Sequence, residues 1–261
     1  MSNYDITLKF DLSKKICDDE MIGTLEYNKG EYEFKLRDDY ETEIIRPSDY
    51  DKYPYTISNY KKLVVVLESP HIDEFKCELG NRPANGETGK RFRNNFDLII
   101  NNKYSSSLQP DNYIIYLVNS IQYQCSLGFK PDSFRDYVWL ELWKNKDIRD
   151  DFVGRIDSID PDIIINCCTK GGHKRDFDGK YISEDDNDKS ILKVSVKFIE
   201  KLGYDVCKPI VNDGNKNCVL KYQSANEITL KNFVKYQIEN ECKFIKKPNN
   251  YFELLHPINW I

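Results

Sequence analysis

Five apolar residues, Leu63 to Leu67, follow one another without a polar break. A continuous apolar run of this length, rich in valine, is typical of a strand buried on both faces, as in a parallel sheet. The run gives way to the segment 68–71, Glu-Ser-Pro-His, in which the proline cannot donate to a sheet ladder. A carboxylate and an imidazole therefore stand at the carboxyl end of a buried strand, the edge at which open α/β sheets bind ligands.

Three later segments are predicted to be strands of the same sheet. Tyr113–Val118 and Ile163–Ile165 are apolar runs, and Tyr251–Leu255 is a short final strand. Segments with helical spacing occur at 90–101, 137–143, 191–202 and 227–245. Strands that alternate with helices predict an α/β fold, which we expect to be a three-layer α/β/α domain around a central, mainly parallel four-stranded sheet.

The N-terminal part of the chain predicts β structure of a different kind. Residues Tyr4–Leu12 alternate between polar and apolar side chains. Gly23–Tyr27 and Tyr32–Leu36 flank an Asn-Lys-Gly-Glu segment, which is a hairpin signal. We therefore expect residues 1–60 to form a β-rich extension packed against an α/β domain that spans residues 61–261.

Composition places the chain among ordinary globular proteins. Of its 261 residues, 40% are hydrophobic and 31% are charged, so the chain is long enough and apolar enough to bury a core. No apolar run approaches the roughly 20 residues of a membrane span, and the first residues, MSNYDITLKF, lack the basic and then apolar pattern of a signal peptide. We expect a monomeric cytoplasmic protein, bacterial or phage-encoded, that does not bind membranes.

The cysteines and the net charge bear on cofactors and partners. Eight cysteines are scattered without any Cys-x-x-Cys pair, whereas zinc and iron–sulfur sites usually contain close pairs. We therefore predict free, mostly buried thiols in a reducing compartment, and neither a metal nor a cofactor. The net charge of −5 argues weakly against a nucleic-acid partner, but net charge says little about a single cleft.

Polar residues follow all four predicted strands. Glu68 and His71 follow the first, Asn119 the second, the loop Gly171–His173 the third and His256 the last. The carboxyl ends of parallel strands meet at one edge of a sheet, so these groups are expected to converge. A carboxylate, an amide and an imidazole in one cleft suit base recognition and glycosidic-bond chemistry, and they also suit several hydrolases.

Four segments occur in an order and at separations that are typical of one known family. They are Leu-Glu-Ser-Pro-His at 67–71 with the glycine-rich loop up to Gly89, Tyr-Leu-Val-Asn-Ser-Ile at 116–121, Asp-Pro-Asp-Ile-Ile-Ile at 160–165, and His256-Pro257. Together they resemble the uracil-DNA glycosylase superfamily across roughly residues 60 to 261. The likeness is closest to its family-four and family-five branches, in which the first of these strands ends in Gly-Glu-Ala-Pro-Gly.

The resemblance implies a role for each matching residue. Glu68 would stabilise positive charge on the sugar or orient the attacking water, with Asp73 and Glu74 as reserve candidates for the acidic group. Asn119 would hydrogen-bond the Watson–Crick edge of a flipped base, and His256 would stabilise the leaving base as its anion. Such chemistry passes through an oxocarbenium-like sugar and needs no metal, but the nucleotide must first be flipped out of the stack.

The sequence departs from the family pattern in and around the expected base pocket. Further pocket positions would be Ser69, Pro70, His71 and Ala84. Leu67 and His71 replace expected glycines, and Ala84 replaces the aromatic residue that stacks on the base, which predicts an enlarged pocket. The intercalating loop after Pro257 is expected to be mostly absent, and Trp260 is predicted to pack down rather than act as a wedge.

Two basic segments are candidates for contacts with the DNA backbone. The loop after the third strand combines a Gly-Gly turn with cations, and the helix at 90–101 begins with cations, so both offer positive charge to phosphate. The histidine of that loop is also explained as an ordinary surface residue. The residues concerned are Lys170, Gly171, Gly172, His173, Lys174, Arg175, Lys90 and Arg91.

The resemblance leads us to expect a DNA glycosylase that excises a modified base. Our first expectation is a bulky modified pyrimidine, such as the glucosylated hydroxymethylcytosine of phage DNA, removed in anti-phage defence. Ordinary uracil repair is the alternative within this class. Outside it, the chain is a non-catalytic protein that binds modified DNA or a nucleotide, or a hydrolase of small nucleosides, which the acidic net charge favours slightly.

Overall fold

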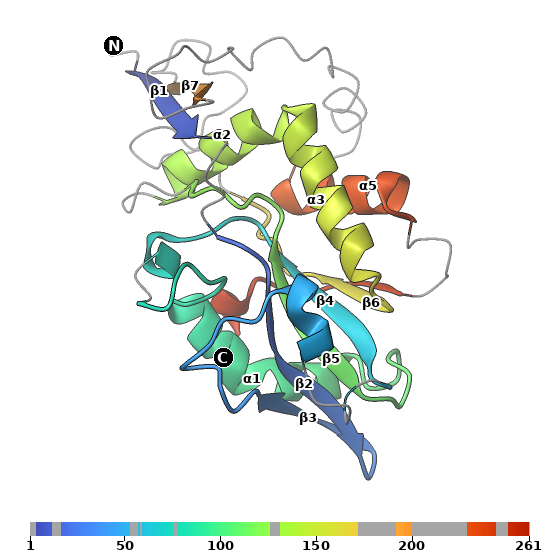
Figure 1. Cartoon of the computed structure of the whole chain (residues 1–261). Helices are drawn as coiled ribbons and strands as arrows, with labels where there is room; N and C mark the ends of the chain where they lie inside the picture. The colour runs from blue at the N-terminus through green and yellow to red at the C-terminus, as the bar shows by residue number, and fades with distance from the viewer. Residues whose placement is uncertain are drawn as a thin grey trace.

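The computed structural model describes residues 4–11, 17–52, 57, 59–75, 78–125, 131–171, 192–199, 229–243 and 250–260, and its main body is a six-stranded sheet with helices (Figure 1). The strands of this sheet are, in spatial order, β3 (Glu31–Leu36), β2 (Glu20–Asn28), β5 (Tyr113–Asn119), β4 (Lys61–Leu67), β6 (Ile163–Asn166) and β8 (Tyr251–Glu253). The helices are α1 (Glu87–Lys103), α2 (Pro131–Trp143), α3 (Lys146–Ile159) and α5 (Leu230–Glu241), with short 3₁₀ turns η1 (Pro47–Lys52), η3 (Ile72–Phe75) and η6 (Pro257–Asn259). The predicted α/β class is confirmed, and no helix in the described part of the chain has the length and apolar character needed to cross a membrane.

Strand β4, whose apolar run is the strongest fold signal in the sequence, lies inside the sheet. It pairs in parallel with β5 on one side and with β6 on the other, and β8 continues the parallel part beyond β6. Its residues Leu63–Leu67 are all buried, as the apolar run predicts. The register places Leu67 opposite Asn119 and Val66 opposite Asn166, so the three strands end side by side.

Alternate residues of β4 point to opposite faces of the sheet, and each face has its own apolar cluster. Leu63, Val65 and Leu67 belong to a cluster that contains the buried side chains of α1. Val64 and Val66 belong to a second cluster that contains side chains of α2, α3 and α5. Figure 1 shows α1 on one side of the sheet and the other three helices on the opposite side.

The predicted N-terminal hairpin is confirmed, and it belongs to the central sheet. β2 pairs with β3 so that Tyr27 lies opposite Tyr32, and the turn between them has positive φ at both Lys29 and Gly30, as a tight two-residue hairpin turn requires. β2 also pairs antiparallel with β5. The sheet therefore has six strands where four were expected, because a hairpin from the N-terminal region extends it.

Two segments differ from what the sequence patterns predict. β1 (Tyr4–Asp11) pairs in parallel with β7 (Leu192–Ile199) as a separate two-stranded sheet. The helix predicted at 191–202 is therefore wrong, because Leu-Lys-Val-Ser-Val-Lys-Phe-Ile alternates with the period of two that fits a strand. Helix α3 was not predicted at all, since its first turns are mostly charged and conceal the apolar spacing.

Candidate active site

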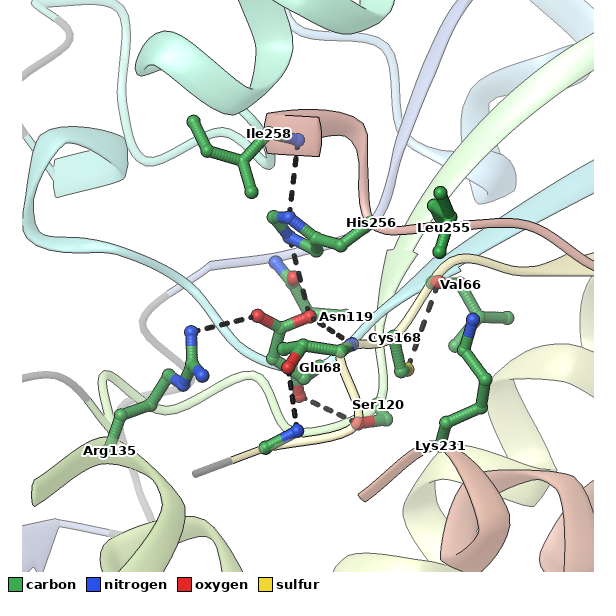
Figure 2. Close-up of polar contacts among 12 residues, drawn as sticks. Val66, Glu68, Asn119, Ser120, Arg135, Cys168, Lys231, Leu255, His256 and Ile258 are labelled. Carbon is green, nitrogen blue, oxygen red and sulfur yellow. Dashed lines mark hydrogen bonds and ion pairs between the residues drawn. The ribbon is translucent and has the colours of Figure 1, made fainter. Parts of the chain in front are cut away.

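The four parallel strands end at one edge of the sheet, and polar side chains gather there (Figure 2). Glu68 follows β4, Asn119 ends β5, Asn166 ends β6 and His256 lies shortly after β8. Since these strands are parallel neighbours, residues that are far apart in the sequence become neighbours in space. Glu68 and His256 are in direct contact within this group.

The carboxylate of Glu68 is buried and receives three donors. Its Oε1 lies 3.2 Å from Nη1 of Arg135, and its Oε2 lies 3.4 Å from Nε2 of His256. The backbone N–H of Thr169 also donates to Oε2, at 3.3 Å. A carboxylate that is only 4% exposed is tolerated in a protein interior when it is paired and hydrogen-bonded in this way.

The backbone of Glu68 is held as firmly as its side chain. Its carbonyl oxygen accepts hydrogen bonds from Nε1 of Trp139 at 2.9 Å, from Oγ of Ser120 at 2.6 Å and from the N–H of Ile121 at 3.2 Å. Arg135 and Trp139 lie one turn apart on α2, so one helix reaches both the carboxylate and the carbonyl group of the same residue. The position of the carboxylate is therefore set by α2 and by the loop after β5.

His256 is a neutral imidazole with a defined tautomer. Its Nδ1 accepts the backbone N–H of Ile258 at 3.3 Å, so the ring proton is on Nε2, which faces Glu68. Burial lowers the pKa of His256 below its usual range; Glu68 acts in the opposite direction, and the charges of Arg135 and Lys231 lower the pKa further. The ring is therefore a hydrogen-bond donor through Nε2 at neutral pH.

A second buried cluster joins Asn119 to Glu74 and Cys17. Nδ2 of Asn119 lies 3.4 Å from Oε2 of Glu74 and 3.8 Å from Sγ of Cys17. The same Sγ lies 3.7 Å from Oε2 of Glu74. Burial raises the pKa of Glu74 to about 8, although Asn119 and two backbone N–H groups favour its ionised form. Among the described residues, Oδ1 of Asn119 is buried and has no hydrogen-bond partner.

The other residues predicted from the first motif lie in different surroundings. Ser69 and Pro70 are buried, whereas His71 is half-exposed. Asp73 is half-exposed as well, and its Oδ2 lies 3.3 Å from Nδ1 of His71. Of the two reserve candidates for the acidic group, Glu74 therefore joins the buried cluster, and Asp73 pairs with His71 near the surface.

Ala84 occupies the position at which an enlarged pocket was expected. It is 1% exposed, belongs to the apolar cluster of α1 and has a left-handed backbone, with a φ of 54°. Its carbonyl oxygen would lie 1.4 Å from a Cβ atom at Gly89, which explains the glycine there. Its N–H is one of the donors to Glu74. Ala84 is thus closely packed against described residues, and its small side chain does not border the open space that we expected.

The two candidate phosphate-binding cations on α1 differ in their contacts. Arg91 pairs with Glu87 at 3.0 Å and donates to the carbonyl oxygens of Ile258 at 2.9 Å and of Trp260 at 3.2 Å. It therefore fastens the C-terminal turn η6 to α1. Lys90 is exposed on the first turn of the same helix.

The basic loop after β6 lies only partly within the described residues. The carbonyl oxygen of Lys170 accepts the N–H of Leu230 at 3.1 Å, which connects the loop to the start of α5. The N–H of Gly171 donates to Oγ1 of Thr169 at 2.7 Å, and its φ of 88° favours glycine. The remaining predicted residues lie outside the described part of the chain: Gly172, His173, Lys174 and Arg175.

Trp260 is packed down, as predicted. It is 3% exposed, its ring centroid lies 5.6 Å from that of Phe92, and its Nε1 donates to the carbonyl oxygen of Leu255 at 2.9 Å. The apolar side chains that are exposed next to His256 are Leu255, at 55%, and Ile258, at 39% (Figure 2). These two residues, and not Trp260, are therefore available to an apolar partner at the site.

Sequence reasoning missed three contributors to the site. Arg135 lies one turn before Trp139 on α2, and this spacing was the available signal. The N–H of Thr169 belongs to a loop that was considered only for its basic residues. Cys17 gave no signal, because its contact with Glu74 exists only in the folded chain.

The cysteines of the described residues behave as the sequence predicts. Five of them are free and buried: Cys17, Cys125, Cys167, Cys168 and Cys242. Burial raises the pKa of each of these thiols, so they stay protonated and weakly nucleophilic at neutral pH. Within the described ranges, no group of three or more His, Cys, Asp or Glu side chains is arranged to hold a metal ion.

No protein-family model, no curated protein and no solved structure matches this chain.

Proposed function

We propose that this protein is a monofunctional DNA N-glycosylase of the uracil-DNA glycosylase superfamily, which flips a nucleotide out of DNA, excises its base and leaves an abasic site. The observation that carries the proposal is the contact between the Glu68 carboxylate and the Nε2–H of neutral His256, beside Asn119 at the end of the neighbouring strand. The parallel order β5, β4, β6, β8 and the two apolar clusters support a three-layer α/β/α domain as the core of such an enzyme.

The proposed reaction breaks the bond between C1′ of the sugar and the base nitrogen, with the electron pair leaving on the base. Glu68, fixed by Arg135 and Thr169, would stabilise the oxocarbenium-like sugar and accept a proton from the water that bonds to C1′. In the reaction His256 would turn its Nε2–H from Glu68 to the leaving base, and this hydrogen bond stabilises the negative charge of the base. Asn119 would bind the Watson–Crick edge of the flipped base.

Exposed apolar residues next to the proposed catalytic histidine support base flipping. Leu255 and Ile258 flank His256-Pro257, and both are among the exposed large apolar side chains of the described chain. Apolar side chains inserted between base steps unstack DNA, and they would fill the gap that a flipped nucleotide leaves. The hydrogen bonds from Arg91 would hold this turn in place.

The proposed substrate is a modified pyrimidine of phage DNA, such as glucosylated hydroxymethylcytosine, and the proposed role is anti-phage defence; uracil is the alternative base. Because Ala84 is closely packed, its small side chain no longer argues that the pocket is enlarged for a bulky base. The test therefore includes both bulky and small bases. The net charge of −5 favours a second candidate function, in which the same groups hydrolyse free nucleosides.

The test is to incubate the purified protein with normal, uracil-containing and phage-modified DNA, and with free nucleosides. Abasic sites and released bases are then measured. Base release from one kind of DNA but not from nucleosides supports the proposal, and release from nucleosides alone supports the second candidate. Absence of release from every substrate contradicts both.

Substitutions at Glu68 and His256 test whether these residues cause the base release. Glu68→Gln and His256→Ala should each slow base release by about 100-fold or more, as the loss of one electrostatic stabiliser typically does, while DNA binding is retained. Glu78→Gln removes an exposed carboxylate from the loop between η3 and α1 and should leave the rate unchanged. Wild-type rates in both site variants would show that these residues are not catalytic.

A further inference from the structure

An asparagine side chain has a donor at one end and an acceptor at the other, so its orientation decides which base edge it reads. A 4-oxo pyrimidine such as uracil presents an N3–H donor and an O4 acceptor. A 4-amino pyrimidine such as cytosine presents an N3 acceptor and an N4 amino donor. Turning the amide by 180° exchanges these two preferences, so selectivity at Asn119 requires a group that prevents the turn.

Glu74 contacts one end of the Asn119 amide. Nδ2 lies 3.4 Å from Oε2 of Glu74, whereas Oδ1 has no partner within the described residues. Asn119 is 1% exposed, and an unpaired buried acceptor is unfavourable. The amide is therefore bound at its nitrogen, and its oxygen gains a hydrogen bond when a ligand brings an N–H group to it.

Glu74 is itself held by groups that only donate. The backbone N–H groups of His71 and Ala84 bind its carboxyl group, which lies in a side chain that is 4% exposed. Burial raises the pKa of Glu74 to about 8, so the acid is mostly neutral at pH 7. Sγ of Cys17 also donates to Oε2, at 3.7 Å, and the same oxygen accepts from Nδ2 of Asn119.

We propose that Glu74 is a positioning residue, which holds the amide of Asn119 in one orientation and so makes the pocket discriminate between 4-oxo and 4-amino pyrimidines. The proposal rests on the proposed function, because it takes Asn119 to be the residue that reads the flipped base. Glu74 acts through Asn119 and touches neither the base nor the reacting atoms. Without Glu74, the amide of Asn119 can turn and pair with the Watson–Crick edge of either kind of pyrimidine.

The experiment measures binding and base release separately, on oligonucleotides that differ at a single position. The matched pairs are uracil with cytosine, and 5-hydroxymethyluracil with 5-hydroxymethylcytosine. Wild-type protein is expected to favour one member of each pair by about 100-fold or more, because the other member leaves buried polar groups unpaired. In Glu74→Gln this ratio should fall at least tenfold, since the glutamine offers an oxygen to Nδ2 and an NH2 group to Oδ1 equally well.

Glu74→Gln keeps the volume of the buried side chain, and Glu78→Gln serves as the exposed control with an unchanged ratio. A folded Glu74→Gln protein with wild-type ratios overturns the inference and leaves the glycosylase assignment intact. If Glu74→Gln loses activity equally on both members of a pair, the role of Glu74 is purely structural, and the inference is overturned as well. Wild-type protein that releases no base but has a binding preference, lost in Glu74→Gln, upholds the inference and contradicts the catalytic assignment. Equal binding of both members by wild-type protein overturns the inference.

Discussion

The carboxyl edge of the parallel strands and the N-terminal segment 17–43 contribute to the site in different ways. The edge supplies the three groups proposed to act on a substrate: Glu68, Asn119 and His256. The N-terminal segment supplies buried side chains that hold the surrounding loops: Cys17, Asp19, Glu20 and Arg37. The resemblance to a glycosylase covers the first set only, so the region outside it provides much of the frame.

Glu20 shows how the N-terminal segment fixes the first motif. It is fully buried, with Oε1 2.7 Å from Nη2 of Arg37 and Oε2 3.1 Å from Nε of Arg82. Arg82 is 1% exposed, donates to the carbonyl oxygen of Tyr40 at 2.7 Å, and lies in the loop between η3 and α1. The loop that also contains Ala84 is therefore anchored to the N-terminal region by a buried ionic network.

Asp19 makes the corresponding connection to β5. Its carboxylate oxygens lie 2.6 and 2.8 Å from Nη1 of Arg155, and Nη2 of Arg155 donates to the carbonyl oxygen of Asn119 at 2.9 Å. One acidic residue thus fixes the backbone of the residue proposed to read the base. The motif residues are therefore positioned by partners that no motif contains.

A substitution at Glu20 should destabilise the protein more than any other considered below. Glu20→Gln removes the buried carboxylate that pairs with Arg82 and Arg37, so the free energy of unfolding should fall by about 3–5 kcal/mol. Glu26→Gln, in an exposed pair with Lys35 on the same hairpin, should cost less than about 1 kcal/mol. Urea unfolding of the three proteins measures both changes. If the two variants have the same midpoint, the N-terminal network does not hold the fold.

The stability of the protein should depend on the ionisation of Glu74, a buried acid that lies where the two regions meet. Burial raises its pKa from 4.5 to about 8, so between these pH values the folded protein keeps a proton that the unfolded chain releases. The free energy of unfolding should therefore fall as pH rises through this window. Glu74→Gln should remove that fall, a difference of up to about 5 kcal/mol above pH 8. Parallel stability curves for variant and wild type, from urea unfolding at a series of pH values, would contradict the buried neutral acid.

The sequence predicts elements whose signal is local. β4, β5 and β6 are apolar runs buried on both faces, and the parallel arrangement of their ends follows from alternation with helices. The contact between Glu68 and His256 is a consequence of that topology. The alternation of β7 was also present in the sequence, but its apolar residues fit helical spacing as well, and the wrong period was chosen.

The contacts that hold the site residues in place cannot be recognised from the neighbouring sequence. Cys17, Asp19 and Glu20 belong to the segment Cys-Asp-Asp-Glu, which has the composition of an exposed loop, yet all three side chains are buried. The burial of Asp19 and Glu20 depends on arginines from distant loops and helices, and that of Cys17 on contacts with Glu74 and Asn119. Such pairs are set by tertiary packing, so periodicity and spacing do not reveal them.

Two neighbouring cations on α1 are expected to have different roles. Lys90 is exposed, whereas Arg91 donates to the carbonyl oxygens of Ile258 and Trp260 in the turn after His256. Lys90→Ala should weaken DNA binding and lower the slope of log affinity against log salt by about one, because one phosphate contact is lost. Arg91→Ala should leave the salt slope unchanged and slow base release by about threefold to tenfold, since each lost hydrogen bond is worth about 1 kcal/mol. Binding titrations at several salt concentrations, beside single-turnover base release, distinguish the two roles. If Lys90→Ala leaves the slope of log affinity against log salt unchanged, Lys90 does not contact DNA. If Arg91→Ala lowers that slope, the guanidinium of Arg91 contacts a phosphate and does not hold the turn.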